Sequence, residues 1–303
     1  MQSKKINVGG QAVIGGVMIR GPKKYVVAAR KNKKIVSMGG KIPIKKNKFL
    51  NLPFIRGFAN LADMLVIGMK SLNWSAGQAG EEDNISKKEM TTMIIVTSAI
   101  AVFFVIALPY FLTSLIGFAE EKKPVLFNLV DGIIRILIFL IYIFAISFMK
   151  DVRILFQYHG AEHKAIHCYE KGKKLNIENV KKFTTLHPRC GTSFLFIVFI
   201  VSILVFSILP SVIMIYYPNF SNFNAWLRRG ILFPIRILLI PVIAGISYEI
   251  LKISDRHQKS LLFRIISMPG LLLQKITTQE PNKNQIEVAI YSLEKLLKIE
   301  KEK

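Results

Sequence analysis

The sequence predicts a predominantly α-helical, polytopic membrane protein with about four transmembrane helices and a small N-terminal β-unit in the cytoplasm. Two observations point to this fold class. Hydrophobic residues make up 51% of the 303-residue chain, and yet its formal net charge is +23. A soluble domain rarely combines these properties, whereas a membrane protein separates them, with apolar runs in lipid and basic segments beside an anionic membrane face.

Four apolar segments are long enough to cross a bilayer core, which requires about 20 residues. They are residues 91–118, 125–149, 192–217 and 229–250. The net charge of the flanking segments alternates along the chain, with values of +12 (1–90), 0 (120–123), +5 (150–191), 0 (218–227) and +4 (251–303). Because Lys and Arg accumulate on the cytoplasmic side, we expect both termini and the middle loop in the cytoplasm and the protein in the cytoplasmic (inner) cell membrane.

The N-terminal segment 1–50 has the pattern of a small antiparallel β-unit. The β-prone stretches QAVIGGVMI, KYVVAA and KIVSM are separated by GPK and KNKK, which are turn signals. The following segment 51–90 is apolar between Leu52 and Gln78, but it carries Arg56, Asp63 and Lys70. These charges disfavour a simple span and favour an interfacial or re-entrant helix with a linker.

The C-terminal segment 251–303 is predicted to form a cytoplasmic amphipathic tail. Its last part repeats apolar residues at helical spacing, at Ile286, Ile290, Leu293, Leu296 and Leu297. We expect two short helices there that lie on the membrane or on the β-unit.

A histidine cluster carries the strongest chemical signal. His159, His163 and His167 are spaced i, i+4, i+8, so on an α-helix they share one broad face with Glu162 and Glu170. Neutral imidazoles at i, i+4 can bind one divalent metal ion, which would be zinc or another divalent transition metal.

The run from His159 to His163 also matches H-x-x-E-H, a pattern in which the two histidines bind zinc and Glu162 acts as general base. A second half-site follows at His187 and Cys190. Two arrangements stay open on spacing alone. His163, His167, His187 and Cys190 would form a closed structural site. His159 and His163 with one more oxygen ligand would form an open catalytic site.

Topology indicates where a further ligand would come from. The predicted fourth span ends at the cytoplasmic membrane edge with Glu249, at the depth of the histidines. A carboxylate at that depth needs a partner. Glu249 is therefore a candidate metal ligand or a hydrogen-bond partner of one, followed closely by His187.

Other polar residues predict structure or partners. Asp131, Arg135 and Arg236 lie within predicted spans and favour an ion pair that holds helices together, or else a polar pathway. The basic residues of 23–48 have few aromatic neighbours, which argues against nucleic-acid binding and for anionic lipid headgroups. Cys168 and Cys190, the two cysteines, form no disulfide framework.

Several segments together resemble the bacterial YqhQ-type membrane protein family. They are GGQAVIGGVMIRGP (9–22), HGAEHKAIHCYE (159–170), LHPRCGTSF (186–194), GISYEIL (245–251) and QKITTQEPNKNQIEVAI (274–290). The resemblance covers nearly the whole chain. It implies a metal-dependent membrane protein without naming a substrate. The family's characteristic polar positions fall here on His159, Glu162, His163, His167, His187, Cys190 and Glu249.

The leading functional hypothesis is a metal-dependent enzyme, a zinc hydrolase at the cytoplasmic membrane face, with Glu162 as its base. Its substrate would be a peptide, a lipid headgroup or another ester or amide. One alternative is a membrane scaffold or assembly factor whose His/Cys cluster is a structural metal site. A further alternative is a transporter, which with four spans per chain would require a homo-oligomer.

Overall fold

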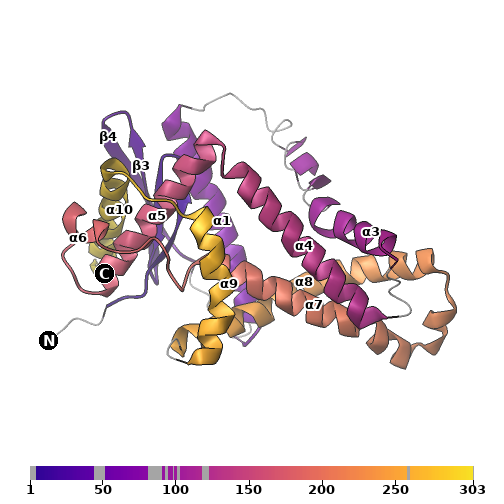
Figure 1. Ribbon diagram of the computed structural model, residues 1–303. Coiled ribbons are helices and arrows are strands. Elements are labelled where there is room, and N and C mark those ends of the chain that lie inside the picture. Colours follow the sequence, from indigo (N-terminus) through magenta and orange to yellow (C-terminus); the bar gives the residue numbers. More distant parts are fainter. Residues whose placement is uncertain are drawn as a thin grey trace.

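The computed structural model describes residues 5–43, 52–80, 91–92, 95–97, 99–100, 103–117, 123–257 and 260–302. The described chain has two parts (Figure 1). One part contains the β-sheet with helices on both of its faces, and the other consists of long apolar helices. Helix α5 (Lys150–Glu170) follows α4 (Pro124–Ile146) almost directly and so connects the two parts.

The predicted N-terminal β-unit is an antiparallel sheet in the order β1-β2-β3-β4, which confirms the prediction. Its strands are β1 (Gly9–Val13), β2 (Gly16–Arg20), β3 (Lys24–Lys31) and β4 (Lys34–Lys41). The stretch QAVIGGVMI, taken as one β-prone unit, forms two strands. The chain reverses at Gly15, whose φ of +63° is a left-handed conformation that glycine adopts without a steric penalty.

Both faces of the sheet are covered by helices. Successive side chains of a strand point to opposite faces, so an unbroken apolar run places apolar side chains on both. Val17 and Ile19 of β2 face α5 and α10 (Lys283–Lys301). Met18, between them in sequence, faces the opposite side together with Ile67 of α1 (Ile55–Ala79). The sheet therefore lies between α1 on one face and α10 and the histidine-bearing α5 on the other.

The C-terminal tail divides into two helices, and they lie in different places. Helix α10 packs on the sheet, with Ile286, Leu293 and Leu296 fully buried. Its start is fixed by a capping box in which Asn282 and Gln285 exchange side-chain and backbone hydrogen bonds. Helix α9 (Leu261–Thr277) lies instead beside the long apolar helices. The short helix α6 (Ile177–Lys181) follows α5.

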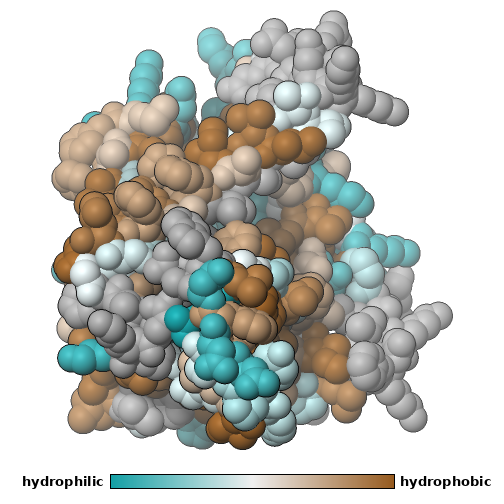
Figure 2. Space-filling view, turned by 90° about the vertical axis from the view of Figure 1, so that its right-hand side faces the viewer, coloured by the Kyte–Doolittle hydropathy of each residue, from teal (hydrophilic) through white to brown (hydrophobic). Residues whose placement is uncertain are grey.

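Three helices of the described chain are long and apolar enough to cross a membrane. These candidate spans are Val125–Ile146 in α4, Gly191–Tyr216 in α7 (Gly191–Tyr216) and Gly230–Ser254 in α8 (Ala225–Arg256). The space-filling view of this end of the molecule shows hydrophobic side chains over much of its described surface (Figure 2). The protein is thus a membrane protein with three such helices among the residues that the structure describes.

The first predicted span, 91–118, falls partly outside the described residues. Its described portion contains a π-helical turn (Phe103–Ala107) and α3 (Leu108–Leu115). After α7, a 3-10 turn (Pro218–Asn222) leads into α8.

The polar residues within the spans bond to one another. Arg135 donates to the Asp131 carboxylate at 2.7 Å, one turn away on α4. Arg236 of α8 donates to Asn128 of α4 at 3.1 Å and lies over the rings of Tyr110 and Phe206. The ion pair therefore lies within one helix, and the link between helices runs through Arg236 and Asn128.

Candidate metal centre

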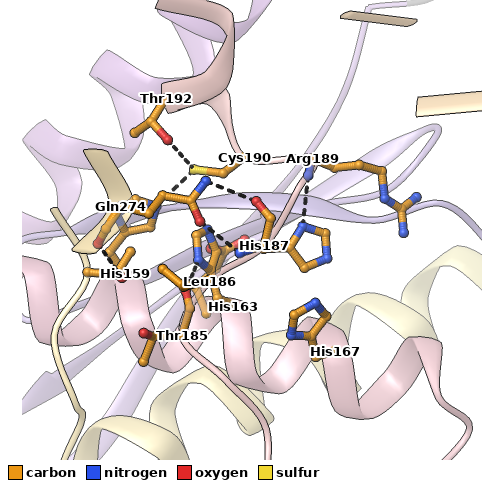
Figure 3. A network of polar contacts seen from close by, with 12 residues as sticks. His159, His163, His167, Thr185, Leu186, His187, Arg189, Cys190, Thr192 and Gln274 are labelled. Atoms are coloured by element: carbon orange, nitrogen blue, oxygen red, sulfur yellow. Dashed lines mark hydrogen bonds and ion pairs between the residues drawn. The ribbon is translucent and has the colours of Figure 1, made fainter. Parts of the chain in front are cut away.

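Helix α5 presents its histidines toward the loop that precedes α7. Four imidazole rings follow one another, with centroids 4.4 Å apart for His159 and His163, 5.6 Å for His163 and His187, and 4.4 Å for His187 and His167. The predicted common face of α5 therefore exists, and the chain returns to it with His187 and Cys190 (Figure 3).

The first cluster consists of His159, His163 and Cys190. One donor atom from each lies within 4.8 Å of the other two, close enough to surround a single ion. His159 Nε2 and Cys190 Sγ lie 3.3 Å apart. Two imidazoles and one thiolate are a zinc-type ligand set, and a three-residue set leaves one tetrahedral position open.

Hydrogen bonds to backbone carbonyls determine the tautomers of both histidines. His159 Nδ1 donates to the carbonyl oxygen of Thr277 at 2.8 Å, and His163 Nδ1 donates to that of Thr185. A carbonyl oxygen only accepts, so each Nδ1 carries the proton and each Nε2 keeps its lone pair. A carbonyl bonded to the second ring nitrogen is the usual support of a metal-binding histidine.

Cys190 occupies the N-cap position of α7, where the helix dipole favours negative charge. The Thr192 hydroxyl donates to its sulfur at 3.4 Å. The cysteine is thus placed among the Thr192 hydroxyl, the N-terminus of α7 and the Nε2 atom of His159.

Glu162 lies beside this cluster and is almost fully buried, with 3% of its surface exposed. Its Oε2 atom is 3.4 Å from His163 Nε2. Burial raises the pKa of Glu162, although the charges of His159 and His187 partly oppose the rise. Burial also lowers the pKa of His163. Both effects favour neutral side chains in the free protein.

A glycine on β1 makes room for this carboxylate. A Cβ atom on Gly10 would lie 2.6 Å from the carbonyl oxygen of Met18 and 2.8 Å from Glu162 Oε1. Any side chain at this position would therefore displace Glu162 or the strand. The N-terminal glycine motif thus contributes to the site through close approach of its backbone.

The second cluster consists of His167, Glu170 and His187, whose donor atoms also lie within 4.8 Å of one another. Its groups are already bonded. His187 Nδ1 accepts from the backbone N–H of Arg189 at 3.2 Å, so Nε2 carries the proton and donates to Glu170 at 3.2 Å. Glu170 also pairs with the Arg189 guanidinium. His187 consequently keeps no free lone pair on its ring.

The pKa directions in the second cluster reflect these contacts. Burial, assisted by the charge of His187, lowers the pKa of His167 to about 4. Burial alone would raise the pKa of Glu170, but its hydrogen bond to His187 and the charges of His187 and Arg189 hold it below its ordinary value. The cluster is therefore an ion-pair network between a carboxylate and a guanidinium.

The segment between α9 and α10 packs tightly against α5. The carbonyl oxygen of Gln279 would lie 2.1 Å from a Cβ atom on Gly160, so the two backbones touch there. One turn further along, the buried ammonium of Lys164 pairs with Glu280. This segment also supplies the Thr277 carbonyl that orients His159, so the tail motif TTQEP belongs to the site.

Gln274 of α9 fixes the loop that carries His187. Its fully buried amide accepts from the backbone N–H of His187 at 2.7 Å and donates to the carbonyl of the same residue at 3.0 Å. The two bonds resemble one rung of a β-ladder (Figure 3). The loop before α7 is thereby anchored three residues ahead of Cys190.

The predicted site residues are not all brought together in one place. His159, His163, Cys190 and Glu162 meet, whereas His167 and His187 belong to the neighbouring network, so the closed set of His163, His167, His187 and Cys190 is divided. Glu249 lies in neither cluster. Its carboxylate accepts a bidentate hydrogen bond from Arg56 of α1, at 2.6 Å from Nε.

Three contacts of the site were not predicted from the sequence. They are the hydrogen bonds of Gln274 to the loop, the close approach of Gly10 to Glu162, and the pairing of Glu170 with His187 and Arg189. The motifs that contain Gln274 and Gly10 carried a signal, because both are among the segments that resemble a known family. Their role depends on long-range contacts that no spacing rule reveals.

The fold and the site define a membrane protein with a partly buried His/Cys cluster between a sheet-bound helix and the start of α7. Residues 52–299 match the model of a family described as "Protein of unknown function (DUF1385)", and the chain belongs to this family. It is 33% identical over 310 residues to the "Uncharacterized protein YqhQ" of Bacillus subtilis (strain 168). This alignment covers 96% of this chain and 92% of that protein. No solved structure matches the chain.

Proposed function

We propose that this protein is a metal-dependent hydrolase of the membrane, with zinc as its metal and its site on the cytoplasmic face. One observation carries the proposal. Three donor atoms, from His159, His163 and Cys190, converge within 4.8 Å, and a buried carboxylate, Glu162, stands beside them. Each histidine is held by a carbonyl at Nδ1, which leaves Nε2 for an ion.

The residues fit the chemistry of such a site. A zinc ion held by two imidazoles and a thiolate would act as a Lewis acid and bring the pKa of a coordinated water to about 7. Glu162 Oε2 lies 3.4 Å from His163 Nε2, beside the atoms that would hold the ion, and this carboxylate would serve as the general base. Burial raises the pKa of Glu162, and the charge of a bound cation would favour the ionised form that a base requires.

The placement of the site supports action at the cytoplasmic surface. The basic segments flank the histidines in sequence, and positive charge accumulates on the cytoplasmic side of membrane proteins. Helix α5 begins four residues after the end of α4, so the site lies close to the membrane. Anionic lipid headgroups are the natural partners of this basic face.

The test is a substitution that removes the base without removing a ligand. We expect zinc-loaded Glu162→Gln to keep its zinc and to lose hydrolysis by about 10²- to 10⁴-fold, since that is the usual contribution of a general base. Hydrolysis would be measured on a panel of esters, amides and lipid headgroup esters. Glu170→Gln is the matched control, because it alters a carboxylate of the same helix outside the first cluster. Equal loss in both variants would contradict the assignment of Glu162.

A second candidate function is a scaffold with a structural metal site. The burial of the cluster favours it, because His163 is 2% exposed and a closed site has no need of substrate access. In that case, Glu162→Gln would leave the fold and the metal content unchanged, and Cys190→Ser would make the loop before α7 accessible to protease. Limited proteolysis of this loop, with and without chelator, separates the two functions.

A further inference from the structure

A pocket of about 210 Å³ lies next to the candidate metal centre. It is lined by Pro188, Arg189, Tyr248, Leu251, Lys252, Ser254 and Ser267. Pro188 and Arg189 are the two residues between His187 and Cys190, so one wall of the pocket is the loop that carries the cysteine ligand. The remaining walls come from α8 and α9.

The pocket lies at the depth of lipid headgroups. Tyr248, Leu251 and Lys252 belong to the last two turns of the candidate span Gly230–Ser254. The end of a span marks the border between acyl chains and headgroups. Large apolar side chains of the adjoining surface of α8 and α9 are exposed, as acyl chains would require; they are Ile253, Leu261, Ile265 and Met268.

The charges around the pocket favour an anion. Arg189 and Lys252 line it, and no carboxylate does among the described lining residues. Glu170 pairs with Arg189 of the pocket wall, and Glu249 pairs with Arg56. These three cations and two carboxylates leave one net positive charge at the membrane surface. A phosphate diester carries the one negative charge that would balance it.

We propose that this pocket binds the phosphate of an anionic glycerophospholipid, with Lys252 as its main cationic contact and Arg189, whose guanidinium also pairs with Glu170, as the second. Its volume lies below the roughly 300–1,000 Å³ of pockets for drug-sized ligands, so it suits a headgroup whose acyl chains stay outside in the bilayer. A lipid phosphate in this pocket would make a headgroup ester the substrate of the proposed hydrolase. This substrate class rests on the proposed function.

Binding can be measured apart from turnover. The full-length Glu162→Gln protein in neutral detergent would be examined by native mass spectrometry with phosphatidylglycerol, phosphatidylcholine and glycerol 3-phosphate. We expect preferential retention of phosphatidylglycerol. Adding Lys252→Gln should weaken that retention about ten- to a hundredfold, which is the cost of one hydrogen bond to a charged group. Lys275→Gln, which removes an exposed lysine of α9 outside the pocket, should leave it unchanged.

Three results would overturn the inference. They are equal retention of the two lipids, equal loss of binding in Lys252→Gln and Lys275→Gln, and binding of glycerol 3-phosphate as tight as that of the lipid. Zinc content of the same samples separates this inference from the proposed function. Zinc without phosphatidylglycerol binding contradicts the lipid pocket alone, and lipid binding without zinc contradicts the metal site alone.

Discussion

The two polar clusters beside α5 each contain two histidines and differ in what those histidines bond to. In the first cluster, carbonyl oxygens hold the Nδ1 atoms of His159 and His163, so both Nε2 atoms point toward Cys190 with free lone pairs. In the second cluster, both ring nitrogens of His187 bond to protein groups, and Arg189 neutralises Glu170.

The difference shows that a group of close histidines is not in itself a metal site. What matters is where the second nitrogen of each ring is bonded. The clusters are one to two turns apart on one helix, and both gather three potential ligands within 4.8 Å. We therefore propose metal binding at the first cluster and structural support at the second. Substitutions in and around the two clusters test that division, beginning with the largest expected effect.

Replacement of the two cysteines should separate ligand from core residue. We expect Cys190→Ser to weaken zinc binding more than about 100-fold, because a hydroxyl keeps its proton at neutral pH and loss of a ligand exceeds the 10- to 100-fold cost of losing a supporting group. Cys168→Ala should leave zinc affinity unchanged, since Cys168 packs in the core between α5 and the sheet. Competition with a chelating indicator measures both, and equal affinities in the two variants would count against Cys190 as a ligand.

Gly160→Ala should damage the first cluster through its carbonyl support. The new Cβ would lie 2.1 Å from the Gln279 carbonyl oxygen, which forces the segment that contains Thr277 away from α5. We expect a loss of about 1–3 kcal/mol in unfolding free energy and roughly tenfold weaker zinc binding. Gly230→Ala is the control, as its Cβ would meet nothing within 4 Å. Wild-type stability in the Gly160 variant would refute the tight contact.

Gln274→Leu should weaken the second cluster while sparing the ligands of the first. The substitution leaves the backbone N–H of His187 buried without its partner and removes one of two hydrogen bonds to its carbonyl, which still accepts from the Cys190 N–H, at a cost of about 1–3 kcal/mol. Thermal unfolding in detergent measures this loss, and zinc at saturation should still bind. Gln279→Leu changes an exposed hydrogen bond to Arg153 and should cost less than about 0.5 kcal/mol. If the two variants unfold alike, the buried glutamine is not the anchor.

The pH dependence of the metal-free protein is the smallest expected effect. The pKa of His167 is lowered from 6.5 to about 4 in the folded chain, so the unfolded chain takes up a proton first as the pH falls. Stability is therefore not reduced by His167 above about pH 6.5, and the free energy of unfolding falls as the pH drops from 6.5 toward 4. His167→Gln should therefore flatten the fall in melting temperature over this range, whereas substitution of the exposed His257 should not. Parallel curves for all three proteins would contradict the assignment.

Much of the architecture could be predicted from local patterns. Alternating β-prone stretches, long apolar runs and helical spacing depend on neighbours in sequence, and they correctly indicated the antiparallel sheet, three of the long apolar helices and the histidine face of α5. The turn at Gly15 was hidden inside an unbroken β-prone stretch, because the glycines there admit a strand as well as a reversal.

The arrangement of the site could be predicted only in part. The spacing of His159, Glu162 and His163 was sufficient to bring these residues together, because one helix carries all three. The partner of Glu249 could not be deduced, since Arg56 reaches it from nearly 200 positions away in the chain. The supports of the histidines are backbone carbonyls of Thr185 and Thr277, and a carbonyl leaves no trace in residue type.

The most direct test of this division of roles is the zinc content of the purified full-length protein beside two alanine variants of the same helix. We predict about one equivalent of zinc in the wild type, its loss in His163→Ala and its retention in His167→Ala. Equal loss in both variants would mean that the two clusters act as one site. Zinc lost from His167→Ala and kept by His163→Ala, or no zinc in the wild type after reloading under reducing conditions, would contradict the assignment of metal binding to His159, His163 and Cys190.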